Sequence, residues 1–394
     1  MIPESIVRFF TKESRSLACM SIVCGTAKDS LFVCDGIKDL DNSPVQFNSI
    51  YDLASLTKLF TGLLVMRLFE QKKLDLDAPI TRYAHQFFNL NRTSVRQVAW
   101  FKTRLSTYKR IDNAESREEA LNVLFSASQQ ESDRVVYSDI PAMVLKYVIE
   151  EASGYSFMDC LHHEILDPLG MKETFSFIPE ELRWRCVSTD REHRIEKGHY
   201  TLREGILPGT PHDPKARILY TGTEDCPGHA GLFSTVDDLT KLCQGILSGR
   251  VVSSNSLNMM VENHAGQFMN DSQPLGCQCY IRHPNQHFSE VPTFMSRASL
   301  GLSGFTGNHL AIDPLLGMFE FYLGSRVLNR VSVIIPNEGE SLENYGLDKN
   351  GIGEVTWPDG RKVASSVNYI YLKDDYLHPR LAPILNGMRL KNKA

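Results

Sequence analysis

Residues 51–64 read YDLASLTKLFTGLL and carry the strongest local signal in the chain. Apolar residues recur at helical spacing through this stretch and on to Leu68, which predicts a helix buried on one side. Asp52 or Ser55 can start that helix. Ser55 and Lys58 are three residues apart, so a helix places both side chains on one face. A neutral lysine can take the proton of a serine hydroxyl, so this pair suits a nucleophile and its base.

The proposed base has to lose its charge before it can act. At pH 7 only about one in 10³ unperturbed lysine side chains is neutral. We therefore expect the site to lower the pKa of Lys58 toward about 7.5, at a cost of about 4 kcal/mol that burial could supply. The Ser-x-x-Lys motif alone is weak evidence, because it occurs in many unrelated helices. A β-rich hairpin shortly before the helix is the context that favours a catalytic role for the motif.

The flanking sequence predicts strands at both ends of the chain and helices between them. Residues 2–12 suggest a short amphipathic helix, and the β-rich runs 17–24 and 30–34 on either side of the turn 25–29 predict a hairpin. From about residue 74 to about residue 264 helical periodicity dominates, as in Ile140–Ser153 and 237–247. Strand character returns after about residue 276, and four runs are expected to complete the sheet: 278–281, 305–312, 318–323 and 331–335.

This order predicts an α+β fold, an antiparallel β-sheet flanked by helices with an inserted, mainly helical domain. We expect residues 1–75 and 265–394 to form the discontinuous sheet domain and residues 76–264 to form the helical one. A cleft at their junction is the expected place for catalytic residues. The role of residues 337–394 is left open.

Composition narrows the possible partners and the compartment. The chain has 42 basic and 47 acidic side chains and no long basic run, so nucleic acid is not an expected partner. We expect no membrane span, because no apolar stretch reaches about 18 residues. The start of the chain does not resemble a secretory signal, and nine scattered cysteines suit free thiols. A cytoplasmic location is expected, and an exported protein that has lost its signal is the alternative.

The stretch 51–64 resembles the active-site helix of the penicillin-binding-protein and β-lactamase-related serine hydrolases, in their class C-like carboxypeptidase and esterase branch. Tyr137-Ser138-Asp139 resembles the Tyr-x-Asn element of that family. The resemblance implies that Tyr137 takes part in proton transfer beside the nucleophile. It also places Asp139 in the substrate site, at the position where asparagine is most familiar.

Two further segments, 209–213 (GTPHD) and 228–235 (GHAGLFST), resemble a paired signature of the same branch. Their small residues suit a close approach of backbone, and Ser234 or Thr235 suits a helix N-cap. We interpret this signature as structural. His212 is a candidate substrate-binding residue in the cleft.

Residues 301–307, GLSGFTG, resemble the strand that carries the family's Lys-Thr-Gly or His-Thr-Gly motif beside the substrate. Leu302 departs from the pattern, so the cation or imidazole expected there is missing and binding of a D-alanyl carboxylate is in doubt. The resemblance implies that Leu302, Ser303 and Gly304 border the substrate. It also implies that the backbone N–H groups of Ser55 and Phe305 form the oxyanion hole.

These residues together predict a serine hydrolase that acts on an ester, amide or peptide bond of a small-molecule or peptide substrate through an acyl-enzyme on Ser55. No cofactor or metal is expected. The nearest approaches to metal ligands, Cys277 with Cys279 and His162 with His163, lack partner ligands at workable spacing. Two alternatives remain: a catalytically silent binding protein with the same fold, and a D,D-carboxypeptidase if the protein is exported. The oligomeric state is left open.

Overall fold

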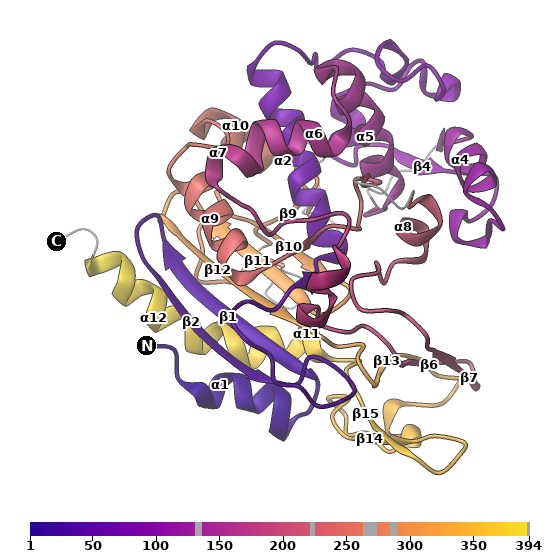
Figure 1. Cartoon of the computed structure of the whole chain (residues 1–394), viewed down its shortest axis with the longest axis vertical. Helices are drawn as coiled ribbons and strands as arrows, with labels where there is room; N and C mark the ends of the chain where they lie inside the picture. Colours follow the sequence, from indigo (N-terminus) through magenta and orange to yellow (C-terminus); the bar gives the residue numbers. More distant parts are fainter. Residues whose placement is uncertain (131–135, 221–224, 263–273, 284–289, 392–394) are drawn as a thin grey trace.

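A six-stranded antiparallel sheet, in the order β2-β1-β12-β11-β10-β9, forms the centre of the computed structural model (Figure 1). The structure describes residues 1–130, 136–220, 225–262, 274–283 and 290–391. The strands are β1 (Cys19–Thr26), β2 (Ser30–Gly36), β9 (Tyr280–Ile281), β10 (Leu300–Gly304), β11 (Asn308–Asp313) and β12 (Met318–Gly324). Strands from both ends of the chain therefore share one sheet, and the predicted N-terminal hairpin and α+β class are confirmed. The expected domain boundary near residue 264 lies outside the described residues.

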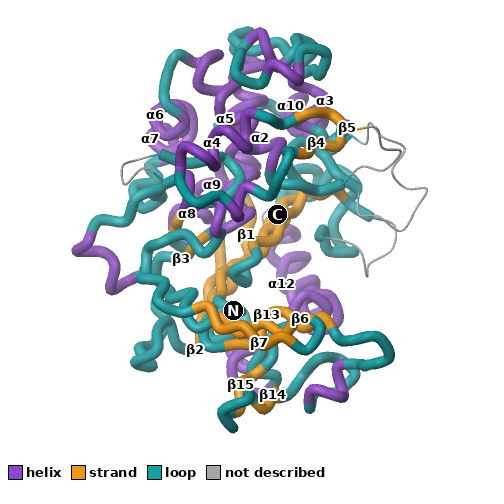
Figure 2. The backbone as a smooth tube through the Cα atoms, turned by 90° about the vertical axis from the view of Figure 1, so that its right-hand side faces the viewer, coloured by secondary structure: helices purple, strands orange, loops and turns teal. Residues whose placement is uncertain are grey.

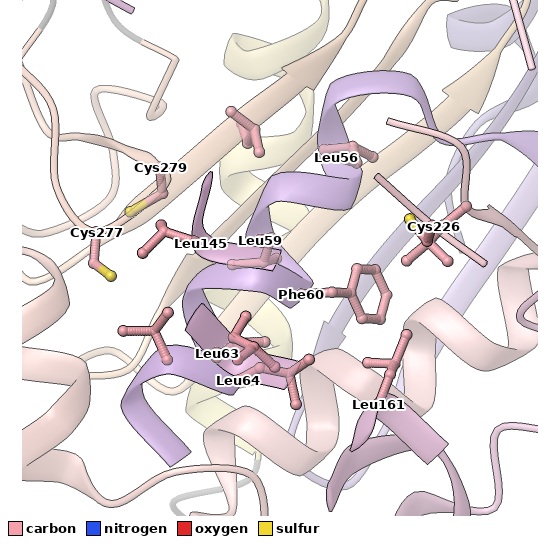
Figure 3. Packing of buried hydrophobic residues seen from close by; sticks show 14 of the residues in the cluster. Leu56, Leu59, Phe60, Leu63, Leu64, Leu145, Leu161, Cys226, Cys277 and Cys279 are labelled. Carbon is pink, nitrogen blue, oxygen red and sulfur yellow. The ribbon is translucent and has the colours of Figure 1, made fainter. Parts of the chain in front are cut away.

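Helix α2 (Thr57–Glu70), which follows a 3-10 turn at Ala54–Leu56, runs through the interior of the molecule. Its residues 57–66 are all buried, so the prediction that only one side is buried was wrong. The reason is that Lys58 is the only charged residue of the helix before Arg67, which leaves no polar face for solvent. Figure 3 shows leucines and Phe60 of this helix packed against side chains from other elements, including Leu145 and Leu161.

Seven other helices of the described chain lie on the same side of the sheet as α2 (Figures 1 and 2). They are α3 (Val95–Ala99), α4 (Arg117–Phe125), α5 (Ile140–Ser153), α6 (Phe157–Leu161), α7 (Asp167–Leu169), α8 (Pro214–Leu219) and α10 (Ser254–Met260). Of these, α5, α6 and α10 pack against α2. The bounds of α5 match the prediction, because Pro141 suits its first turn and Gly154 ends it in the left-handed conformation at φ 76°. Helix α9 (Val236–Leu247) packs on β1, β11 and β12, so this part of the expected helical insert lies against the sheet.

The other face of the sheet is covered by helices from the two chain ends, α1 (Glu4–Arg8) and α12 (His378–Lys391), with the short α11 (Tyr369–Leu372) near by (Figure 1). A second cluster of buried apolar side chains lies between these helices and the sheet. The chain beyond residue 337, which had no assigned role, thus supplies the cover of this face. No helix in the described ranges combines the length and apolar character needed to span a membrane.

The remaining strands form small sheets. Strand β13 (Arg330–Ile335) was expected in the central sheet, but it pairs in parallel with β6 (Glu192–Glu196), which pairs with β7 (His199–Arg203). β3 (Tyr51–Asp52) pairs with β8 (Phe233–Ser234) just before the helix that carries Ser55. Two other pairs are β4 (Arg104–Ser106) with β5 (Ser128–Gln130), and β14 (Glu354–Thr356) with β15 (Lys362–Ala364). The boundaries of the two domains stay a prediction.

Candidate active site

The turn that presents Ser55 is held in an unusual backbone conformation. Ala54 has a φ of 46°, a left-handed conformation that costs a non-glycine residue roughly 1 kcal/mol or more. The buried carboxylate of Asp52 stabilises the turn, because one oxygen accepts the Ala54 N–H at 2.8 Å. Its other oxygen accepts the backbone N–H of His212 at 2.7 Å. The strand before the helix and the segment around residue 212 are thereby fixed to the same carboxylate.

Lys58 is fully buried and its ammonium group has three partners. Its Nζ donates to Ser55 Oγ at 3.1 Å and to the His229 carbonyl oxygen at 3.1 Å, and it lies 2.7 Å from Asp139 Oδ1. An ammonium group has three N–H donors and no acceptor, and each of the three contacts is with an oxygen atom that can accept one of these donors. The geometry is therefore that of a charged lysine.

The charge state of Lys58 differs from the sequence-based expectation. Burial by itself lowers the pKa of Lys58, but the carboxylate of Asp139, together with Tyr137, more than offsets it, so the pKa is raised. Burial is the largest single effect on the pKa of Asp139 and raises it, but the attractions of Lys58, His229 and Lys215 together outweigh burial, so the pKa is lowered. The expectation that the site depresses the pKa of Lys58 was wrong, since it rested on burial and left out the charge of Asp139.

Tyr137 lies beside both members of the pair. The Lys58 Nζ lies 4.9 Å from the centre of its ring, and both Ser55 and Lys58 are close enough to the hydroxyl to act on its pKa. The ring stacks on Tyr280 with centroids 5.2 Å apart, which fixes its orientation. Burial raises the pKa of Tyr137, so this phenol holds its proton in the resting site and can donate it.

A second lysine balances the charges around Asp139. Lys215 Nζ lies 3.2 Å from Asp139 Oδ2 and 3.1 Å from Asp213 Oδ2, and so bridges the two carboxylates. The other oxygen of Asp213 lies 2.9 Å from His229 Nε2. Although Asp139, Asp213 and His229 are close enough to share a metal ion, Lys58 and Lys215 already balance the charges of the two carboxylates.

Strand β10 borders the site, but its side chains do not all face it. Leu302 is completely buried in the main apolar core, so the prediction that it borders the substrate was wrong. Ser303 Oγ donates to Glu290 Oε2 at 2.5 Å and contacts His309 Nδ1 at 3.1 Å, so its hydroxyl is engaged by protein groups instead of being free for substrate. Gly304 lies against the turn before Ser55, where a Cβ atom would come within 2.5 Å of the Leu53 carbonyl oxygen.

The geometry of the turn after β10 favours the proposed oxyanion hole. Phe305 follows the strand directly, and its side chain is 38% exposed. In the described part of the chain, neither its N–H nor that of Ser55 donates a hydrogen bond to a carbonyl group. The turn is tied to the strand before Ser55, because Thr306 Oγ1 and Asn308 Nδ2 both donate to the Asp52 carbonyl oxygen, at 2.8 and 2.7 Å.

Ser55 opens onto a cleft of about 270 Å³. Phe305, His212 and Lys215 line it together with three arginines, Arg110, Arg194 and Arg203. The His212 ring is stacked on Phe305 with centroids 5.7 Å apart, and its Nε2 lies 3.2 Å from Glu192 Oε2. His212 is thus placed in the cleft as expected, although a buried carboxylate holds its ring.

The sequence did not single out Lys215 or Asn308, because neither belongs to a recognisable motif. The signature at 228–235 does more than pack, since its backbone supplies the His229 carbonyl to Lys58 and the Gly228 carbonyl to Thr61 Oγ1 at 2.6 Å. Thr235 caps α9 as predicted, with its side chain accepting the Asp238 N–H.

Known proteins are similar to this chain in sequence and in fold. Residues 21–331 match the Beta-lactamase family model. A putative D-alanyl-D-alanine carboxypeptidase of Salmonella enteritidis PT4 is 27% identical over 318 residues, which cover 71% of this chain and 70% of the relative.

Two solved structures show the same fold. The hydrolase EstCE1, described as having promiscuous acyltransferase activity, has a TM-score of 0.64 at 18% identity and covers 81% of this chain and 91% of its own. The unliganded simvastatin synthase LovD of Aspergillus terreus has a TM-score of 0.63 at 16% identity, covering 85% and 93%. Because the family model spans most of the sequence, the chain belongs to the Beta-lactamase family of serine hydrolases, which act on ester, amide and peptide bonds.

Proposed function

We propose that Ser55 is the nucleophile of this hydrolase and forms the acyl-enzyme. The observation that carries the proposal is the 3.1 Å contact between Ser55 Oγ and Lys58 Nζ at a cleft that reaches the protein surface. A serine hydroxyl is a weak nucleophile until a neighbouring base takes its proton. Lys58 and Tyr137 are the groups within reach of that proton.

In the proposed reaction Ser55 Oγ attacks the carbonyl carbon of the substrate, and its proton passes to Lys58. Since Lys58 rests as an ammonium ion paired with Asp139, it must first pass one proton to that carboxylate or to solvent. The Tyr137 hydroxyl then donates a proton to the leaving group and regains one from Lys58. The N–H groups of Ser55 and Phe305 stabilise the negative oxygen, and each such donor is typically worth about 10² to 10³ in turnover. Water then attacks the acyl-enzyme, Lys58 takes its proton and returns it to Ser55 Oγ, and the acyl group leaves as a carboxylic acid.

We propose further that the substrate carries a carboxylate near the bond that is cleaved. The side chains of Arg110 and Arg203 at the cleft are 75% and 40% exposed, whereas the carboxylates that pair with them, on Asp112 and Glu192, are 18% and 0% exposed. The accessible part of the mouth is therefore cationic. These arginines could take the place of the cation that the family motif has at position 302. The name of the Salmonella relatives, D-alanyl-D-alanine carboxypeptidase, specifies a substrate with a free carboxylate.

A cytoplasmic location is part of the proposal. All nine cysteines are free thiols, and burial raises the pKa of several of them, that of Cys19 to about 12. Unpaired, unreactive thiols suit a reducing compartment.

Covalent labelling tests the nucleophile. Wild-type protein should react with a fluorophosphonate probe and Ser55→Ala should not, while Ser303→Ala, which removes a hydroxyl on the neighbouring strand, should still be labelled. Labelling of Ser55→Ala at the wild-type rate would place the nucleophile elsewhere. For the substrate, turnover of the neutral 4-nitrophenyl acetate is compared with that of the mono-4-nitrophenyl ester of glutaric acid. Arg203→Gln should raise KM for the charged ester only, and the exposed Arg82→Gln serves as the control.

A catalytically silent binding protein is the second candidate, and one observation favours it. All three donors of the Lys58 ammonium are occupied, so the resting site has no free base. Wild-type protein that neither reacts with the probe nor hydrolyses either ester at any pH at which it remains folded would support this function over catalysis.

A further inference from the structure

A cluster of ionisable side chains lies on the far face of the sheet and takes no part in the proposed reaction. His309 on β11, Glu320 on β12 and His378 at the start of α12 are 0%, 0% and 1% exposed. The Nε2 atoms of His309 and His378 lie 2.9 and 3.3 Å from Glu320 Oε1. One ligand atom from each of the three residues lies within 4.8 Å of the other two.

These short contacts do not have the geometry of hydrogen bonds. Both oxygens of Glu320 and the Nε2 atoms of both histidines are buried without a hydrogen-bond partner, although they lie close together. Such orphaned polar atoms are costly in a protein interior. Ligands about 2.0 to 2.2 Å from a tetrahedral ion lie about 3.3 Å from one another. The spacing around Glu320 is close to that value.

The other ring nitrogen of His309 has the partner that a metal-binding histidine usually has. His309 Nδ1 lies 3.1 Å from Ser303 Oγ, which in turn donates to Glu290. His378 Nδ1 lies 3.2 Å from Asp374 Oδ1 but without the geometry of a hydrogen bond. A hydrogen bond from Nδ1–H to a carboxylate or hydroxyl fixes the tautomer in which Nε2 is free to bind a metal ion.

The charge of the cluster favours a bound cation. Two buried carboxylates, on Glu290 and Glu320, lie near one buried ammonium group of the described chain, that of Lys373, whose Nζ is 3.4 Å from Glu290 Oε2. With neutral imidazoles these three groups carry one excess negative charge, and buried charge without compensation is strongly unfavourable. A bound cation or an added proton would compensate it.

We propose that this cluster binds one zinc-class divalent ion through His309 Nε2, His378 Nε2 and the carboxylate of Glu320. Two imidazoles and a carboxylate favour Zn²⁺ over Mg²⁺ or Ca²⁺, which prefer all-oxygen ligand sets. Because the ligands are buried and come from two strands and α12, the ion fastens the C-terminal helix to the sheet. It also holds β10 indirectly, through the contact between His309 and Ser303.

Metal content tests the proposal without reference to activity. Untagged protein is produced in medium supplemented with Zn²⁺ or with Co²⁺, dialysed against metal-free buffer and analysed by mass spectrometry for metals. We expect about one ion per chain, visible absorption bands in the Co²⁺ form, and a lower Tm after treatment with a strong chelator. His378→Gln should lose the ion, whereas the exposed His85→Gln, which matches it chemically, should keep it.

If His378→Gln fails to fold, the wild-type protein still decides the question. Wild-type protein that carries far less than one Zn²⁺ or Co²⁺ per chain from supplemented medium, and whose Tm does not respond to chelator, would overturn the proposal. A protonated histidine would then balance the excess carboxylate.

Discussion

Replacement of Asp139 by asparagine should make Ser55 more reactive at neutral pH. The carboxylate lies 2.7 Å from the Lys58 Nζ, and at an effective dielectric constant of about 20 this attraction amounts to about 6 kcal/mol. Lys215 also lies 3.2 Å from this carboxylate, and the side chain of Asp139 is 28% exposed. Both weaken the attraction felt by Lys58, so we take about half of it as the loss in Asp139→Asn. A loss of about 3 kcal/mol raises the ratio of neutral to charged Lys58 about a hundredfold.

The assay is the second-order rate of fluorophosphonate labelling, measured from roughly pH 6 to pH 10. Because the wild-type pKa of Lys58 is raised, its neutral amine appears only as the pH increases, and labelling should accelerate toward alkaline pH. In Asp139→Asn the same acceleration should begin at lower pH, with a rate at pH 7 about tenfold or more above wild type. Asp225→Asn is the matched control, since it removes a carboxylate paired with another buried lysine, Lys146, at 3.2 Å.

One result would refute this reasoning. If Asp139→Asn remains folded but labels more slowly than wild type at every pH, then Asp139 takes part in the proton transfer and does not merely hold Lys58 charged. Thermal unfolding must accompany the kinetics, because removal of one partner of a buried pair can cost about 3 to 5 kcal/mol. Ser55→Ala supplies the unlabelled baseline.

Three further predictions concern strand β10 beside the site and the Glu192 carboxylate that contacts His212. Leu302→His restores the family residue, but because this side chain is buried in the core, it should lower the free energy of unfolding by about 1 to 3 kcal/mol and should not speed labelling. Urea unfolding measures the loss of stability, with Leu302→Met as control. Gly304→Ala should slow labelling about tenfold, because the new Cβ would push β10 away from the Leu53 carbonyl and misplace the Phe305 N–H by a fraction of an ångström. The control Gly387→Ala, which has open space around the new Cβ, should be labelled at the wild-type rate. Burial raises the pKa of Glu192, but the contact with His212 and the hydrogen bond from Ser332 together outweigh burial and lower the pKa to about 2. That carboxylate should contribute about 3 kcal/mol of stability above pH 4.5 that is lost as the pH falls toward 2, and urea unfolding of Glu192→Gln at pH 3 and pH 6 should show a smaller difference than wild type.

Local sequence signals were sufficient where the structure depends on local chemistry. The hairpin at the start of the chain and helix α5 follow from β-rich runs, a proline in the first turn and a glycine at the end. The turn at Phe305 did not follow in this way. Residues 305–312 were expected as one strand, but residues 305–307 turn the chain between β10 and β11, with Gly307 at φ 114°. The hydrogen bonds that hold the turn are accepted by the backbone carbonyl of Asp52, which is far away in the sequence.

In the candidate site, too, local motifs predicted some features, whereas others depend on contacts between residues far apart in the sequence. The structure brings Ser55, Lys58 and Tyr137 together, as the ordered motifs implied. The motif could not show which way the side chain of Leu302 points, since the residue lies in the apolar core. The His309, Glu320 and His378 cluster could not be found by spacing either, because its members come from three elements that meet only in the folded chain.

Of the two departures from the family pattern, only Asp139 changes the charge of the site, since Leu302 lies in the apolar core. The aspartate adds a negative charge next to Lys58. Lys215 offsets it, because its ammonium bridges Asp139 and Asp213 and gives a balance of two lysines against two carboxylates. A site balanced in this way stabilises the ammonium form of Lys58. It follows that the reactivity of Ser55 is set by the whole set of four charges, and that Lys215→Gln should raise the pKa of Lys58 and slow labelling, the opposite of the effect expected for Asp139→Asn.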